Sequence, residues 1–278
     1  MRQVLFTIPG VGISIFGYGA MLVLAFVTST WLACWRARRE KLDPEAVLDM
    51  SFWLFAGGLI GARLFFCIQY WGTVIKSPLE IFMYWKGGIV YYGGIFGGVL
   101  AFLIYRKYRN LPLRPYLDAL APSIAVGTLF GRLGCFLNGC CYGDPCGVPR
   151  LGVRFPGGTP VWLAHRARRL IPADAPFSLP VHPTQLYSAA GGLVLLALLS
   201  AYYPLRRRDG EVVGLLMIAY PVTRFLVETM RDDESSLFLG MTASQVCSLL
   251  LLAFTLVFWL VLPNRRVSPP ATAPAPVA

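Results

Sequence analysis

The chain has 278 residues, of which 56% are hydrophobic and 14% are charged, and its formal net charge is +11. A mean hydropathy of +0.60 excludes an ordinary soluble domain and indicates a chain that lies mostly in lipid. Cytoplasmic loops and anionic headgroups account for the excess of Lys and Arg, so we expect no nucleic acid partner. The composition predicts an all-α integral membrane protein surrounded by membrane lipids.

Apolar stretches long enough to cross a bilayer, which takes roughly 20 residues, recur along the chain. The first stretch is too long and too rich in glycine for a signal-peptide core, so we keep it as a span. We expect about seven transmembrane helices, at residues 11–34, 48–70, 88–105, 117–137, 186–203, 211–230 and 239–262.

Lys and Arg are more frequent in the loops after the first, third and fifth spans, and in the tail, than on the opposite side. Because short cytoplasmic loops carry this excess, we expect the N-terminus outside and the C-terminus in the cytoplasm. One polytopic membrane domain then covers residues 1–264, with an external loop at about 138–185. Residues 265–278 are predicted to form a disordered cytoplasmic tail, because their proline content prevents packing.

Paired glycines mark the start of the third span, in Gly87-Gly88-Ile89-Val90-Tyr91-Tyr92-Gly93-Gly94. Glycines in membrane helices usually allow two backbones to approach closely. Here they also favour an interrupted helix start whose free N–H groups bind an anion.

Arg132 lies within the fourth span, in Gly131-Arg132-Leu133-Gly134. A guanidinium near the bilayer centre costs about 2.5–3.5 kcal/mol, so it normally faces an interior and meets an anion. Asp118 lies in the same segment but too far along the helix to be that anion.

Four cysteines cluster where the external loop begins: Cys135, Cys140, Cys141 and Cys146. An oxidising external face favours a disulfide between Cys146 and either Cys140 or Cys141. Zinc ligation, a catalytic or lipid-accepting thiol, and simple packing are the alternatives, since adjacent cysteines are awkward zinc ligands. We treat the four as a possible redox or metal cluster and assign no resident metal.

The chain has two histidines, His165 and His182. His165 lies in a basic run and is expected at the surface. His182 comes just before the fifth span, where it either acts as a base or caps the helix.

Polar residues recur along one face of the sixth span: Tyr220, Arg224, Glu228 and Arg231. Arg224 and Glu228 form an ion pair under one interpretation, because buried charges are usually paired. Together with Arg132, however, the membrane segments hold more guanidinium groups than acids. We therefore expect a bound phosphate, which the guanidinium fork fits well.

Four blocks of the sequence resemble the prolipoprotein diacylglyceryl transferases, and they occur in that family's order. Residues 131–143 are similar to the signature Gly-Arg-x-Gly-Asn-Phe-x-Asn-Gly-Glu-x-x-Gly. The other blocks are 182–187 (His-Pro-Thr-Gln-Leu-Tyr), the stripe at 220–231 and Gly17-Tyr18-Gly19, and Asp118 also matches.

The resemblance implies a multi-pass enzyme of the bacterial plasma membrane. Such an enzyme moves the diacylglyceryl group of phosphatidylglycerol to the lipobox cysteine of a preprolipoprotein signal peptide and releases glycerol phosphate, without a cofactor. The implied phosphatidylglycerol-binding residues are Tyr18, Arg132, Asn138, Gly143, Tyr220, Arg224 and Arg231. The implied catalytic residues are Tyr92, Arg132, His182, Arg224 and Glu228.

Three positions depart from the family pattern. Tyr92 replaces the usual histidine of a His-Gly-Gly block, Cys135 replaces an asparagine and Cys140 replaces a glutamate. Tyrosine, with a pKa of about 10, is a poor base at neutral pH, so we expect either His182 or Tyr92 to activate the acceptor thiol. A related transferase with another acceptor and a non-catalytic lipid-binding membrane protein remain alternatives.

Overall fold

The computed structural model of the chain describes residues 3–7, 14–74, 81, 88, 90–147, 151–231 and 236–261. The chain divides into two compact units, one formed by residues 1–32 and 117–269 and the other by residues 33–116 and 270–278. The tail predicted at 265–278 lies outside the described residues.

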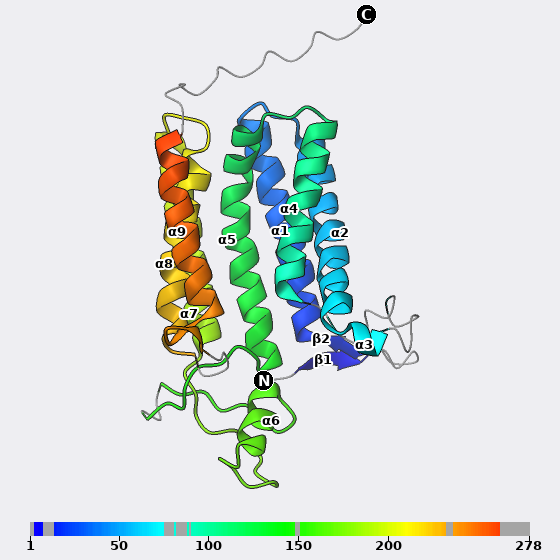
Figure 1. Cartoon of the computed structure of the whole chain (residues 1–278), viewed down its shortest axis with the longest axis vertical. Coiled ribbons are helices and arrows are strands. Elements are labelled where there is room, and N and C mark those ends of the chain that lie inside the picture. Colours follow the sequence, from blue (N-terminus) through cyan, green and yellow to red (C-terminus); the bar gives the residue numbers. More distant parts are fainter. Residues whose placement is uncertain are drawn as a thin grey trace, which may run out of the picture. The chain divides into compact units, whose positions relative to one another are not determined.

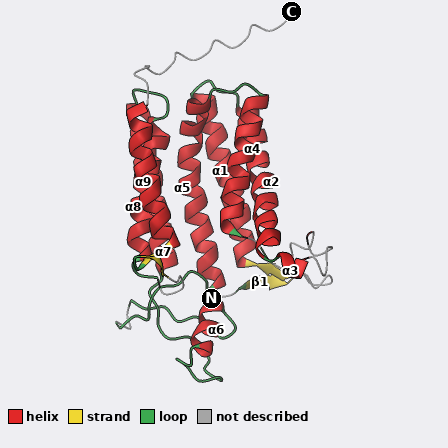
Figure 2. Ribbon diagram, viewed as in Figure 1, coloured by secondary structure: helices red, strands yellow, loops and turns green. Residues whose placement is uncertain are grey.

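Long helices dominate the described chain (Figures 1 and 2). The first unit contains most of α1 (Gly17–Arg39) and of α5 (Leu113–Asn138), with α6 (Pro160–Ala167), α7 (Thr184–Tyr202), the 3-10 turn η3 (Tyr203–Leu205), α8 (Glu211–Glu228) and α9 (Ala243–Val261). It also contains two antiparallel hairpins, which pair β1 (Val4–Thr7) with β2 (Ser14–Phe16) and β3 (Ser236–Phe238) with β4 (Met241–Thr242). The second unit contains α2 (Pro44–Gln69), α3 (Trp71–Val74) and α4 (Tyr91–Tyr108).

A long helix lies on each predicted span, namely α1, α2, α4, α5, α7, α8 and α9. The predicted start at residue 11 is wrong, because residues 14–16 pair with β1 as a strand and α1 begins only at Gly17. Five helices are long and apolar enough to cross a membrane: α1, α2, α5, the segment from Thr184 to Leu205, and α9. These helices make the chain a multi-pass membrane protein.

The core of the first unit joins α5, α7 and α8. Ala121 and Ala125 of α5 pack with Leu195 and Leu199 of α7, and Val212 of α8 completes the cluster. Two glycines allow close helix contacts. A Cβ on Gly192 would come within 3.0 Å of the α5 backbone, and one on Gly214 would come within 2.9 Å of the Trp259 ring on α9. The axial positions of the three helices are therefore fixed by small residues.

In the second unit, α2 and α4 lie side by side (Figure 1). A Cβ on Gly61 would come within 2.7 Å of the Gly97 Cα, and one on Gly57 would come within 2.5 Å of the Ala101 Cβ. Close helix packing is thus confirmed as one role of the glycines near the start of α4. That helix begins at Tyr91 without a side-chain cap. Gly87 and Ile89, part of the anion-site prediction, lie outside the described residues.

The segment between α5 and α7 has its own small core, formed by Tyr142, Phe155, Val161 and Val181. His165 is fully buried beside it, so the prediction that this histidine lies at the surface is wrong. Val161 and His165 are four residues apart on α6 and share its inward face, while the basic residues that follow are exposed. The His165 Nδ1 atom accepts a hydrogen bond from the Leu179 N–H at 3.3 Å.

Candidate active site

A pocket in the first unit opens between α5, α7 and α8. Three of the predicted site residues, Arg132, Tyr220 and Arg224, line it together. The remaining lining is small, polar or aliphatic: Thr128, Ser188, Gly191, Gly192, Leu195, Thr223 and Val227. The pocket therefore joins two guanidinium groups to several hydroxyl groups, which is the chemistry that a phosphate ester requires.

Arg132 brings a cationic side chain to this pocket. The side chain is half-buried, and it makes no hydrogen bond or ion pair with any residue in the described ranges. Asp118, the acid of its own helix, is engaged elsewhere. Its two carboxylate oxygens accept hydrogen bonds from the Gly210 and Val213 N–H groups, at 2.7 and 2.9 Å, where α8 begins. A cation of a membrane helix that meets no acid in the part of the chain that the structure describes indicates an anionic ligand.

Arg224 is bound from both sides by the protein. Its Nη1 atom lies 2.8 Å from the Glu228 carboxylate, and its Nη2 atom donates to the Ser244 hydroxyl at 2.8 Å. The ion pair that the sequence left as one of two interpretations is therefore present. The same side chain also lines the pocket.

Glu228 is the centre of the polar network at the end of α8. Its side chain is fully buried, and besides Arg224 it meets Arg231 at 3.3 Å and accepts a hydrogen bond from the Thr242 hydroxyl at 2.9 Å. Two cations therefore share one buried carboxylate. Glu228 thereby positions Arg224, and it is itself unavailable as a free base.

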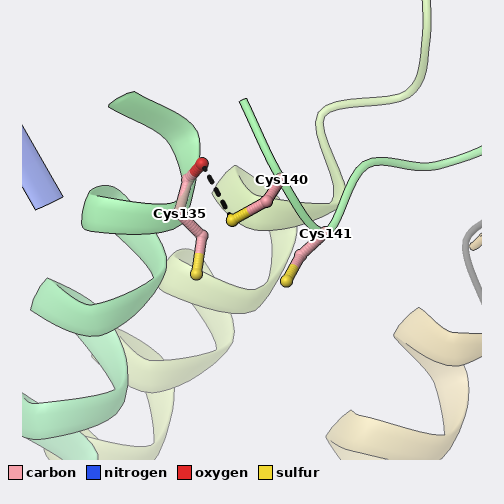
Figure 3. Close-up of side chains that lie close together, drawn as sticks. All are labelled: Cys135, Cys140 and Cys141. Carbon is pink, nitrogen blue, oxygen red and sulfur yellow. Dashed lines mark hydrogen bonds between the residues drawn. The ribbon is translucent and has the colours of Figure 1, made fainter. Parts of the chain in front are cut away.

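Three of the four clustered cysteines come together. The Sγ atoms of Cys135, Cys140 and Cys141 all lie within 4.8 Å of one another, whereas Cys146 is not in this group. Figure 3 shows the three side chains where α5 ends and the following turn begins. All seven cysteines, which lie within the described ranges, are free thiols, so the predicted disulfide with Cys146 is absent. Cys146 is buried, and its N–H donates to the Pro180 carbonyl.

Local helix termination explains why Cys135 and Cys140 meet. Gly139 adopts a φ of +75°, and its N–H donates to the Phe136 carbonyl, while the Cys140 N–H donates to the Cys135 carbonyl. This is the Schellman pattern, which folds the chain back over the last turn of the helix. Cys141 follows with a φ of +58°. Hydrogen bonds from Cys135 and Cys141 lower the pKa of the Cys140 thiol well below its ordinary value.

His182 lies at the entry to α7, bound to a tyrosine. Its Nδ1 atom and the Tyr187 hydroxyl are 3.3 Å apart, and no side chain caps the helix at Pro183. The capping alternative for His182 is therefore wrong. Gly143 packs against this site, since its N–H donates to the His182 carbonyl and a Cβ on it would meet the His182 Cβ at 2.9 Å. Gly143 also forms a β-bridge with Arg231, which joins the α5–α7 segment to the end of α8.

The other predicted site residues lie outside the pocket lining. Tyr18 packs on α5, where a Cβ on Gly134 would come within 3.1 Å of its ring. Asn138 is the last residue of α5, and its carbonyl accepts a hydrogen bond from the Gln3 side chain at 3.0 Å. Tyr92 belongs to the second unit, in the first turn of α4, and is 40% exposed.

Sequence reasoning missed Arg63 and the α7 residues that support the cysteines. Arg63 is buried in α2 and donates to the Ile81 and Gly88 carbonyls, at 3.0 and 2.8 Å. Arg63 lies inside an apolar run, and the same sequence signal identified Arg132. Thr184 and Gln185 donate to the Cys141 and Cys140 carbonyls, and only their place next to His182 marked them in the sequence.

Comparison with known proteins identifies the family. The family described as prolipoprotein diacylglyceryl transferase matches residues 3–261. The phosphatidylglycerol–prolipoprotein diacylglyceryl transferase of Clostridium tetani is 33% identical over 249 residues, which cover 90% of this chain and 93% of that protein. The protein of the same name from Rhodopirellula baltica is 42% identical over 159 residues, which cover 54% of this chain and 32% of that protein. The chain therefore belongs to the prolipoprotein diacylglyceryl transferase family.

Proposed function

We propose that this protein transfers the diacylglyceryl group of phosphatidylglycerol to the lipobox cysteine of preprolipoproteins. The acceptor sulfur attacks the glycerol carbon that carries the phosphate. A carbon–sulfur bond forms, the carbon–oxygen bond to phosphate breaks, and glycerol phosphate leaves with the electron pair. The thiol proton passes to a base, so the reaction needs no oxidant and no reductant.

The observation that carries this proposal is the pocket shared by Arg132 and Arg224. Negative charge grows on the phosphate as the carbon–oxygen bond breaks, and fixed donors aimed at such charge accelerate reactions strongly. Arg132 binds the lipid phosphate as its main donor, because it has no partner among the described residues. Arg224, oriented by Glu228 and Ser244, stabilises the leaving group. The Tyr220 side chain, on the same face of α8, lines the glycerol side of the pocket.

We further propose that all seven long helices cross the bacterial plasma membrane, with the N-terminus outside. α4 and α8 are not among the five described helices that are long and apolar enough to cross a membrane, and α8 carries Glu211, Arg224 and Glu228. Arg224 lines the pocket and is paired with Glu228, which explains why α8 tolerates these two charges within the membrane. In this topology the cysteines and His182 lie near the external surface, where preprolipoprotein signal peptides emerge.

The direct test measures transfer of label from glycerol-labelled phosphatidylglycerol to a lipobox peptide by purified protein in detergent. We expect label on the cysteine peptide and none on its Cys→Ser analogue. Label on other acceptors with none on lipobox peptide would favour a related transferase. Lipid that binds without any turnover would refute catalysis and leave a lipid-binding protein.

The base is tested by His182→Gln and Tyr92→Phe, each of which removes one titratable group with little change in shape. We expect one variant to lose transfer by at least about 100-fold, the scale of general base catalysis, and the other to stay near wild type. Phosphatidylglycerol binding should survive in both. Full activity in both variants would exclude these two residues as the base.

A further inference from the structure

We propose that Cys135, Cys140 and Cys141 hold a Zn²⁺ ion whose fourth position takes the acceptor thiol of the lipobox peptide. The inference rests on the proposed function, since it explains how a thiol is activated in a chain that has tyrosine at position 92. It gives the chain a metal-assisted route to the same thioether product.

The spacing of the three sulfur atoms fits the ion. Thiolates bound at about 2.3 Å to a tetrahedral zinc stand about 3.8 Å apart. The three Sγ atoms lie within 4.8 Å of one another, so small rotamer adjustments close the site. All three residues are half-buried and belong to neither of the packed core clusters of the first unit.

The backbone explains how two adjacent cysteines serve as ligands of one ion. The left-handed conformation of Cys141 turns the chain directly after Cys140, with the result that the two thiols lie on the same side (Figure 3). Two fully buried α7 side chains fix this turn. The Gln185 amide donates to the Cys140 carbonyl at 2.7 Å, and the Thr184 hydroxyl donates to the Cys141 carbonyl at 2.8 Å. Such outer hydrogen bonds orient the ligands of metal sites.

The donor set selects the metal. Thiolate ligands favour zinc and copper(I) over magnesium or calcium, which prefer oxygen. Zinc has no redox chemistry and accepts a fourth ligand readily, and catalytic zinc sites keep three protein ligands with one exchangeable position. A thiol that binds such an ion is deprotonated, which supplies the nucleophile.

The cluster also lies close to the phosphate pocket. Cys135 follows Arg132 by three residues on α5, so the two side chains share a face and are offset by about 4.5 Å along the axis. Arg132 lines the pocket. A thiolate at the cluster would therefore face a diacylglyceryl carbon whose phosphate is bound by Arg132.

The proposed step is balanced. The lipobox thiol replaces a water molecule on the zinc, and its proton passes to the base proposed above, His182 or Tyr92. The bound sulfur then forms the bond to the glycerol carbon, and the carbon–oxygen bond breaks with release of glycerol phosphate. The resulting thioether is a weak ligand, so water replaces it.

Metal content of the purified full chain tests the site without reference to activity. Protein purified without chelator and equilibrated with Zn²⁺ under reducing conditions should retain about one zinc per chain. Cys135→Ser, Cys140→Ser and Cys141→Ser should each lose most of it, whereas Cys247→Ser, at an exposed position of α9, should keep it. Wild-type protein that retains no zinc, or retains only copper, overturns the proposal.

Cobalt substitution tests the open position. The Co²⁺ protein should show a sulfur-to-cobalt charge-transfer band that changes when lipobox peptide is added and does not change with its Cys→Ser analogue. An unchanged spectrum overturns substrate coordination. The outcomes separate the two proposals, because transfer by zinc-free protein rejects the metal site alone. Bound zinc without any transfer rejects the proposed function.

Discussion

Replacing Arg132 and Arg224 one at a time by methionine tests whether the two arginines have different roles. We expect Arg132 to serve the ligand, and Arg224 to serve both the ligand and the stability of the fold. Methionine retains most of the side-chain volume and removes the charge. Arg224→Met breaks the ion pair with Glu228 at 2.8 Å and the hydrogen bond to Ser244. Hydrogen bonds to charged groups contribute about 1.5–3 kcal/mol, and Glu228 keeps Arg231, so we expect the free energy of unfolding to fall by about that amount. Arg132→Met breaks no bond to the described residues and should change it by less than about 0.5 kcal/mol.

Transfer activity should respond differently from stability. Removing one donor from a developing anion lowers kcat by about 100–1,000-fold, and we expect this loss in both variants. The free energy of unfolding is measured by SDS titration in mixed micelles with tryptophan fluorescence, and transfer by the labelled-lipid assay. If Arg132→Met destabilises the protein as much as Arg224→Met does, Arg132 is a structural residue and the phosphate assignment fails. The same conclusion follows if Arg132→Met keeps wild-type transfer.

Two further predictions concern the helices that carry the site. Gly61→Ala should be less stable than Gly94→Ala by about 1–3 kcal/mol. A Cβ on Gly61 would reach the Gly97 Cα at 2.7 Å, whereas one on Gly94 meets nothing closer than 3.5 Å. Equal stabilities of the two variants in SDS titration would contradict this packing. Asp118→Asn should cost about 1–3 kcal/mol, since an amide satisfies only one of the two N–H groups at the start of α8. Hydrogen exchange at that turn should accelerate, with the exposed Asp174→Asn as the control, and unchanged exchange would show that the carboxylate does not hold the turn.

The local part of the site was predictable from sequence. Tyr220, Arg224 and Glu228 follow helical spacing, and α8 presents them as expected. The prediction is wrong for Arg231, because α8 ends at Glu228 and Arg231 forms a β-bridge with Gly143. The approach of Cys140 to Cys135 also has a local cause, because Gly139 ends α5 in a left-handed conformation and turns the chain back. A glycine directly after an apolar helix is the sequence signal for that turn.

Partners that come from distant segments were not predictable. His165 was expected at the surface because basic residues follow it, yet the core around Phe155 and Val161 buries it. Cys146 was expected to join its neighbours, but its backbone pairs with Pro180 and holds its thiol apart from them. The core that buries His165 leaves no sequence pattern within a few residues of that histidine. The same holds for the backbone pairing of Cys146 with Pro180.

The sequence by itself determined that the chain lies in lipid, that its long segments are helices, and that some of these helices carry arginines. Long apolar runs require helices in lipid because every backbone polar group must be satisfied internally, and an arginine in such a run requires an anion. Only the tertiary structure decided which anion each arginine meets. Arg224 finds Glu228 one turn away on its own helix, Asp118 is taken up by the start of α8, and Arg132 is left facing the pocket. The Arg224–Glu228 pair lies within one helix, but the other two outcomes depend on which helices pack together, because a hydrogen bond acts over only about 3 Å.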